Sequence, residues 1–195
     1  ATTDAKFFTL ESMMPTLTED TQLGGQELKR IVFSEDDVQL RVRELGREIT
    51  AAYTASDRLL VLGLLKGSFL FMADLVRAIE LPLHVDFMVA TSYGANKVSS
   101  SDVRLLYDPG ASLKGRAVLL VEDIIDSGNT LTRLIPRLEA RGSASLEICA
   151  LLHKRLTTLE PETRWVGFDA PNEFLVGYGL DYAEDFRHLP YIASL

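Results

Sequence analysis

Three acidic residues and a run of small polar ones lie close together in VLLVEDIIDSGNT, residues 118–130. Glu122, Asp123 and Asp126 would repel one another unless a divalent cation or the hydroxyls of a sugar lay between them. The next residues, 127–130, supply two hydroxyls, an amide and a glycine that lets a ligand approach the backbone closely. At the start of a helix, the N–H groups of such a loop bind anions. Carboxylates for hydroxyls beside a loop for phosphate predict a ribose 5-phosphate site.

A structural interpretation of the same residues is also open. In that interpretation, Asp126 and Ser127 only cap the following helix, while Glu122 and Asp123 are solvated. The local chemistry alone allows both interpretations, so the surrounding elements have to decide between them.

The segments around this loop alternate between apolar runs and helical patterns. Strands are expected at 59–65, 85–90, 117–121 and 146–152, with a short returning strand at 103–107. Helices are expected at 35–54, with Ser34 as its cap, at 69–79, and at 130–141, where Pro136 should kink or restart the helix before Gly142 ends it. Strand–loop–helix units of this length predict an α/β protein with a parallel sheet and right-handed crossovers.

Polar clusters follow three of these strands, at 66–68, 122–130 and 153–155. The carboxyl ends of parallel strands meet at one edge of the sheet, and α/β proteins bind their ligands there. We therefore expect a single site. After residue 155 the pattern becomes irregular and rich in aromatic residues, and this segment is expected to form a small lobe or lid over the crevice.

Composition limits the class of partner. The 195 residues are 47% hydrophobic with a net charge of -8, which fits one domain and argues against nucleic acid as a partner. No apolar run approaches the roughly 18 residues of a membrane span, and no signal peptide is visible. Cys149 is the only cysteine and is expected to be reduced and buried. We expect a cytoplasmic protein without membrane contacts, in which residues 1–30 are a loosely attached extension and residues 31–195 form the domain.

The order of four apolar residues, two acids, two apolar residues and then D-S-G-N-T resembles the signature of purine phosphoribosyltransferases. Three further segments extend the resemblance: LLKGSFLFMADL at 64–75, VDFMVATSYG at 85–94 and FLVGYGLDYAEDFRHLPYI at 174–192. Over residues 30–192 the chain is similar to bacterial hypoxanthine-guanine phosphoribosyltransferases. The resemblance implies the type I phosphoribosyltransferase fold, with a parallel sheet, helices on both faces and a small hood or lid formed by the C-terminal segment.

The resemblance also implies a reaction of purine salvage. With Mg2+, the enzyme would transfer 5-phosphoribosyl from 5-phosphoribosyl 1-pyrophosphate to N9 of hypoxanthine or guanine, giving IMP or GMP and pyrophosphate. Glu122 and Asp123 would hold the ribose hydroxyls, directly or through the metal. Asp126 would serve as general acid/base at purine N7. The 5-phosphate would be bound by Asp126 and the residues that follow it, Ser127, Gly128, Asn129 and Thr130.

For the pyrophosphate, the resemblance implies Lys66 and Gly67, joined to each other by a cis peptide bond, together with Arg187. Asp181 would be a magnesium ligand in addition to Glu122 and Asp123. The structural alternatives are that Lys66 is a solvated surface charge and that Asp181 and Arg187 form a surface ion pair of little energetic value.

For the purine, the resemblance implies Lys154 as donor to the 6-oxo group of a 6-oxopurine. Phe174 would stack on the base, with a core position as its structural alternative, and the backbone of Leu175 would face position 2 of the base. Ser92 and Tyr93 match a loop that closes over the reaction. A homodimer or homotetramer is also expected from the family.

Other classes of function compete with this interpretation. VLLVED at a strand end also occurs in response-regulator receivers, but nothing in a receiver explains D-S-G-N-T. A ligand-sensing regulator of the same fold without turnover is a second alternative, which the intact Asp126, Lys66 and Gly67 disfavour. Within the enzyme class, a preference for xanthine stays open, because the three 6-oxopurines differ only at position 2.

Overall fold

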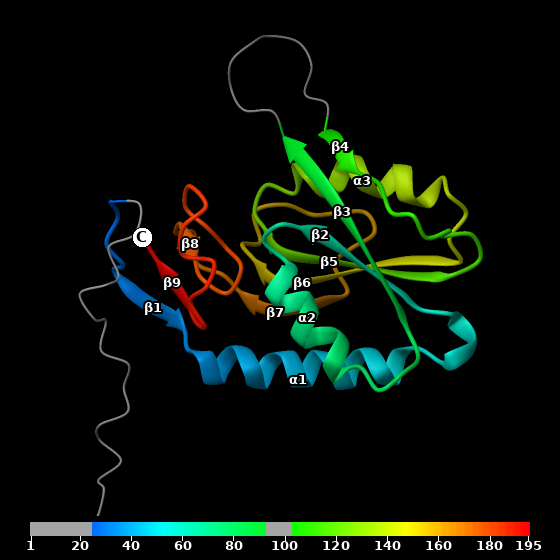
Figure 1. Ribbon diagram of the computed structural model, residues 1–195, viewed down its shortest axis with the longest axis horizontal. Coiled ribbons are helices and arrows are strands. Elements are labelled where there is room, and N and C mark those ends of the chain that lie inside the picture. Colours follow the sequence, from blue (N-terminus) through cyan, green and yellow to red (C-terminus); the bar gives the residue numbers. More distant parts are fainter. Residues whose placement is uncertain (1–24, 93–102) are drawn as a thin grey trace, which may run out of the picture.

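A sheet runs through the centre of the molecule in the computed structural model, which describes residues 25–92 and 103–195 (Figure 1). Within this part of the chain the sheet has six strands in the order β4-β3-β2-β5-β6-β7. Neighbouring strands are parallel except for the antiparallel pair β3 and β4. The strands are β2 (Leu60–Leu65), β3 (His84–Ser92), β4 (Val103–Tyr107), β5 (Ala117–Ile125), β6 (Ser145–His153) and β7 (Trp165–Asp169).

Helices cover both faces of this sheet (Figure 1). α1 (Glu35–Ala52) and α2 (Phe69–Ala78) pack on one face, and α3 (Asn129–Glu139) packs on the opposite face. In β5, Leu119 belongs to the core under α1 and α2, whereas Leu120 belongs to the core under α3. Successive side chains of a strand point to opposite faces, so a wholly apolar strand serves both cores. The expected α/β architecture is confirmed.

Local signals place α1 as expected. The Ser34 hydroxyl accepts a hydrogen bond from the Asp37 N–H, and the Asp37 carboxylate accepts one from the Ser34 N–H. This reciprocal pair satisfies two backbone donors that would otherwise lack partners at the helix start. The residues at helical spacing are the buried ones: Val38, Val42, Leu45 and Ile49.

The third helix differs from its expected form in one respect, because α3 runs through Pro136 without restarting. Pro136 is exposed, so water can reach the carbonyl group that loses its hydrogen-bond partner. Ile135 and Leu138 are buried and hold the helix to the sheet on both sides of the proline. Gly142 follows with a φ of 74°, the left-handed conformation expected after a helix end.

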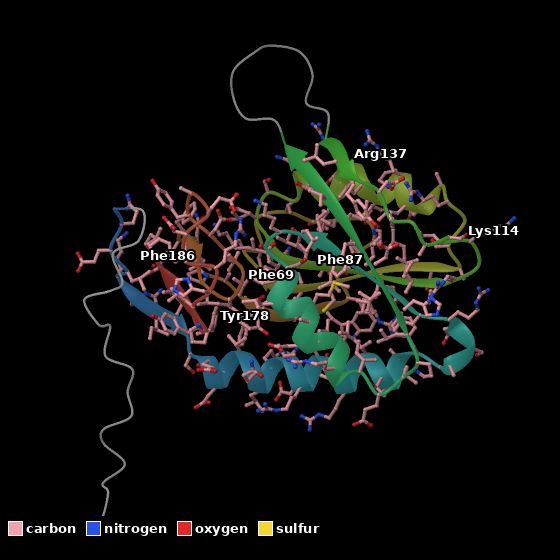
Figure 2. All side chains as sticks on the ribbon, viewed as in Figure 1. Phe69, Phe87, Lys114, Arg137, Tyr178 and Phe186 are labelled. Carbon is pink, nitrogen blue, oxygen red and sulfur yellow. The ribbon has the colours of Figure 1, made fainter. Side chains whose placement is uncertain are left out.

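A smaller antiparallel sheet lies beside the carboxyl ends of the main strands (Figure 1). Its order is β1-β9-β8, with β1 at Arg30–Phe33, β8 at Leu175–Val176 and β9 at Ile192–Ser194. We call these three strands and the loop 177–191 the hood. Phe186, labelled in Figure 2, is buried within it. The expected C-terminal lobe is therefore present, with β1 as an additional strand from before α1.

Several boundaries differ from the sequence-based expectation. β5 continues to Ile125, so Glu122 and Asp123 lie in the strand rather than in a loop. β1 and β7 form where no strand was expected. Leu28 is buried and the Lys29 N–H donates to the Ser194 carbonyl, so the described end of the expected extension packs on the hood. None of the helices in the described ranges is long and apolar enough to span a membrane.

Candidate active site

The loop after β5 encloses a cavity of about 110 Å³. Gly128 stands at the start of α3 with a φ of 69°, a left-handed conformation that glycine adopts without strain. A Cβ at this position would lie 2.7 Å from Thr157 Cγ2, so the loop also needs glycine for space. The cavity at the start of α3 has the polarity that favours an anion. Its lining consists of Glu122, Ile124, Ile125, Asp126, Ser127, Gly128, Asn129, Thr130 and Leu131.

Of the two carboxyl groups at the end of β5, Asp123 accepts a hydrogen bond from the Ile124 N–H, whereas Glu122 has an oxygen without a partner. Both residues are partly exposed as a whole, but Glu122 Oε2 is buried without a hydrogen bond. Burial, followed by the adjacent Asp123, raises the pKa of Glu122 well above its usual value. Burial also raises the pKa of Asp123, against the opposing effects of the Ile124 N–H and Arg187. A hydroxyl donor or a cation would suit the buried Glu122 Oε2 as its missing partner.

Lys154 and Asp126 form an ion pair where neighbouring strands end. Lys154 Nζ lies 3.0 Å from Asp126 Oδ2, and the two side chains are 10% and 54% exposed. The Lys154 N–H also donates to the Ile125 carbonyl, which holds the end of β6 beside the end of β5. The pair therefore lies at the opening of the loop 126–130, here called the phosphate loop. The lysine is largely buried, and the carboxylate is accessible to a ligand.

The loop at 66–68, here called the pyrophosphate loop, is wedged between β5 and the hood. A Cβ at Gly67 would overlap the Asp123 carboxylate, and a Cβ at Gly179 of the hood would overlap the Gly67 carbonyl. The expected position of the cis peptide bond was wrong by one residue, because the cis bond joins Leu65 to Lys66. Leu65 is the last residue of β2, so the chain changes direction there, before Gly67.

Arg187 and Asp181 bring the hood to the same place. Their side chains lie 2.8 Å apart and are only 19% and 29% exposed, so this is not the surface pair of the structural alternative. Arg187 also donates to the Gly179 carbonyl over 2.8 Å, while its Nε is buried without a partner. The positive charge of Arg187 lowers the pKa of Asp123, against the larger opposite effect of burial.

Phe174 is available to a ligand. Its side chain is 53% exposed and meets Tyr182 edge to face, with ring centroids 5.7 Å apart. The alternative of a core position for Phe174 was therefore wrong. Leu175 is buried, and its strand pairs with Ser194 of β9. Phe174 directly precedes this strand, and its carbonyl accepts a hydrogen bond from the Leu195 N–H, so its backbone is held while its ring stays exposed.

The described residues do not bring together the groups for two expected assignments, loop closure and a three-carboxylate metal site. Ser92 is the last residue of β3, whereas Tyr93 lies outside the described residues, so loop closure stays a prediction. Among the described residues, no group of three or more His, Cys, Asp and Glu side chains is arranged to hold a metal ion. Asp181 therefore does not form such a group with Glu122 and Asp123, and its carboxylate is paired with Arg187.

Sequence reasoning missed Glu184 and Thr157. Glu184 lies 2.9 Å from Lys66 and 3.2 Å from Arg187. Thr157 covers Gly128. Neither has a motif of its own, and only the neighbouring D-Y-A-E-D-F-R segment, with acids around an assigned arginine, could have drawn attention to Glu184.

Known proteins with similar sequences belong to the family that the sequence motifs resemble. Residues 36–183 match the family described as phosphoribosyl transferase domain. The hypoxanthine phosphoribosyltransferase of Haemophilus influenzae is 48% identical over 168 residues, which cover 85% of this chain and 94% of that protein. The enzyme of the same name from Escherichia coli K12 is 46% identical with the same coverage.

Solved structures agree with the sequence relatives. A hypoxanthine phosphoribosyltransferase from Staphylococcus aureus superposes with a TM-score of 0.81 at 38% identity, over 93% of this chain and 96% of that one. A hypoxanthine-guanine phosphoribosyltransferase from Bacillus anthracis gives 0.79 at 40% identity, over 87% and 99%. These matches confirm the expected resemblance and fold, and the receiver interpretation was wrong. The chain belongs to the phosphoribosyl transferase domain family.

Proposed function

We propose that this protein is a purine salvage enzyme that transfers 5-phosphoribosyl from 5-phosphoribosyl 1-pyrophosphate to N9 of hypoxanthine or guanine. The observation that carries the proposal is the ion pair of Asp126 and Lys154 beside the phosphate loop. The names of the relatives, hypoxanthine and hypoxanthine-guanine phosphoribosyltransferase, support the same substrates.

The Asp126–Lys154 pair matches one edge of a 6-oxopurine. N7 and O6 are adjacent on that edge and both accept hydrogen bonds. Lys154 carries only donors, so it suits O6, and Asp126 can exchange a proton with N7 as general acid/base. Adenine presents an amino donor in place of O6, which the Lys154 ammonium would meet donor to donor. The pair therefore favours hypoxanthine, guanine and xanthine over adenine.

The donor substrate would occupy the remaining part of the site. The 5-phosphate fits the cavity lined by residues 126–130 at the start of α3. Glu122 and Asp123 would accept hydrogen bonds from the ribose hydroxyls, which supply the partner that Glu122 Oε2 lacks. The pyrophosphate would be bound from the side of the hood by the side chains of Lys66 and Arg187 and by the backbone of Gly67.

The residues also fit a magnesium ion brought with the donor substrate. The unpartnered oxygen of Glu122 and its neighbour Asp123 are hard oxygen ligands of the kind Mg2+ takes, usually with only one or two carboxylates. Asp181 is a further candidate ligand on the hood. When bound, magnesium would neutralise charge on the leaving pyrophosphate.

Three further properties belong to the proposal. Ser92 and Tyr93 would close over the reaction and exclude water from an oxocarbenium-like transition state. Residues 1–30 would be an extension of the domain at 31–195, with the exact division adjusted for the packed Leu28. The enzyme would act in the cytoplasm, where its buried thiol, Cys149, would stay reduced, and it would form a homodimer or homotetramer.

Steady-state kinetics with 5-phosphoribosyl 1-pyrophosphate, Mg2+ and four bases tests the proposal. Hypoxanthine and guanine are expected to be turned over efficiently, and adenine is expected to react at least about a hundredfold less well, because the site would leave buried polar groups unpaired. The highest kcat/KM with xanthine would select the alternative preference. Absence of turnover with every base would favour the ligand-sensing regulator, and efficient use of adenine would remove Lys154 from its assigned role.

A further inference from the structure

Glu184 connects the two cations assigned to pyrophosphate. Its Oε1 lies 2.9 Å from Lys66 Nζ, and its Oε2 lies 3.2 Å from the Arg187 guanidinium. Lys66 follows β2, whereas Arg187 belongs to the hood, so one carboxylate bridges two separate parts of the site. Within residues 25–92 and 103–195, Glu184 is the one acidic residue that pairs with both.

The backbone holds Glu184 in this position. Its N–H donates to Asp181 Oδ2 over 2.9 Å. Its φ of 74° is uncommon for a residue with a side chain and persists only where the surroundings require it. Phe186, two residues further on and labelled in Figure 2, is buried in the hood and so anchors this part of the loop. The fold thus fixes the backbone from which the Glu184 side chain reaches Lys66 and Arg187, although the side chain itself is 65% exposed.

The Glu184 carboxylate has the same requirements as a phosphate oxygen. Lys66, followed by Arg187, lowers the pKa of Glu184, so the group carries its charge at neutral pH. Ammonium and guanidinium N–H groups bind carboxylate and phosphate oxygens alike. A pyrophosphate that reaches for Lys66 and Arg187 must therefore compete with Glu184 for the same donors.

We propose that the Glu184 carboxylate is a stand-in for pyrophosphate. In the free enzyme this carboxylate occupies Lys66 and Arg187, and it is displaced when a pyrophosphate-bearing ligand binds. The inference rests on the proposed function, because the roles of the two cations come from there. In the free enzyme the stand-in screens the repulsion between the cations and links the hood to the pyrophosphate loop. After the reaction it competes with the pyrophosphate product and so promotes its release.

Titration of the free enzyme with inorganic pyrophosphate tests this, by calorimetry with and without Mg2+. Glu184→Gln keeps the shape of the side chain and removes its charge. We expect pyrophosphate to bind about threefold to tenfold more tightly to this variant, since exposed ion pairs are weak competitors. A residue that only supports the hood would give the opposite result, because a loosened hood binds more weakly.

Asp185→Asn is the matched control. It removes the same charge from the same loop, and in the described part of the chain the Asp185 carboxylate makes no ion pair with Lys66 or Arg187. Its effect on pyrophosphate affinity should stay below about twofold. Unchanged or weaker binding in Glu184→Gln overturns the inference, and so does an equal gain in Asp185→Asn.

Lys66→Met separates the inference from the proposed function. It should weaken pyrophosphate binding about tenfold as a charged donor is lost. Unchanged binding would remove Lys66 from the pyrophosphate site, whatever Glu184 does. In the Lys66→Met background the gain from Glu184→Gln should shrink, because one of the two partners is gone, and an undiminished gain contradicts the stand-in role. If thermal melting shows that Glu184→Gln does not fold, Glu184→Ala takes its place in the same titrations.

Discussion

The hydroxyl of Tyr178, a residue labelled in Figure 2, donates a hydrogen bond of 2.6 Å to the Asp74 carboxylate, and this bond joins the hood to helix α2. Asp74 is largely buried and also accepts a hydrogen bond from Gln39 of α1. Burial, followed by the bond to Asp74, raises the pKa of Tyr178, so the hydroxyl keeps its proton and remains a donor. Gly179 follows directly and lies against Gly67. The bond therefore holds the hood where it meets the pyrophosphate loop.

Tyr178→Phe should loosen this attachment. We expect a loss of about 1–2 kcal/mol in the free energy of unfolding, because the hydrogen bond involves a charged, largely buried partner. The KM for 5-phosphoribosyl 1-pyrophosphate should rise more than kcat falls, since the hood carries Arg187. Urea unfolding and steady-state kinetics measure both. Tyr191→Phe serves as the control, because Tyr191 makes no hydrogen bond through its hydroxyl in the described residues. Equal effects of the two variants would argue against a special role for the Asp74 contact.

Asp126→Ala removes the proposed acid/base group. Turnover with hypoxanthine should fall at least about a hundredfold, the usual scale for such a loss, while the protein stays folded because Asp126 is exposed. Single-turnover measurements with saturating substrates test the chemical step directly. Near-normal turnover in the folded variant would show that another group handles the N7 proton.

Gly67→Ala places a methyl group against Asp123. The added Cβ would overlap the carboxylate, so either the pyrophosphate loop or Asp123 must move. Displacement of about 1 Å in an active site costs on the order of a hundredfold in rate, and we expect that loss in kcat/KM for the ribose donor. Gly110→Ala is the comparison, since no atom lies within 4 Å of a Cβ at that position. Normal kinetics for Gly67→Ala would mean that the close approach to Asp123 has no part in catalysis.

His153 should make stability depend on pH. Its ring nitrogens are buried without partners, and burial, followed by Arg155, lowers its pKa from the ordinary 6.5. Below pH 6.5 the unfolded chain then binds a proton that the folded protein refuses, so stability falls as the pH falls. His153→Gln should lose less stability than the wild type between pH 7.5 and pH 5.5 in urea unfolding.

His188→Gln provides the reference for that measurement, because His188 is exposed. Its stability should follow the wild-type pH dependence. Parallel curves for His153→Gln and the wild type would show that His153 gains a proton in the folded protein as readily as in the unfolded chain.

Much of the central sheet could be predicted from sequence, because β2, β6 and the first part of β5 are largely apolar on both faces and are separated by clear helical patterns. The ends were harder. Glu122 and Asp123 look like loop residues, yet β5 continues through them by backbone pairing with β6, which leaves no trace in side-chain type. β1 is also invisible locally, because only its pairing with β9, more than a hundred residues away in the chain, makes it a strand.

The site residues could be predicted where polar residues directly follow a predicted strand. Asp126 and Lys154 were each expected at the carboxyl end of a strand, and the structure brings them together because β5 and β6 are adjacent. Glu184 was missed because its importance depends on Lys66, which lies 118 residues earlier and meets it only when the hood packs. The assignment of Tyr93 to loop closure stays a prediction.

The tight contact between Gly67 and Gly179 has a consequence for changing the specificity of this enzyme. The hood, which includes Leu175 and directly follows Phe174, touches the pyrophosphate loop with no room for even one methyl group between them. Reshaping the hood to admit a different nucleobase would therefore also shift a wall of the proposed donor pocket. Mutants selected for a new base should show altered donor affinity as a side effect, and directed evolution of this scaffold should recover compensating changes in the two loops together.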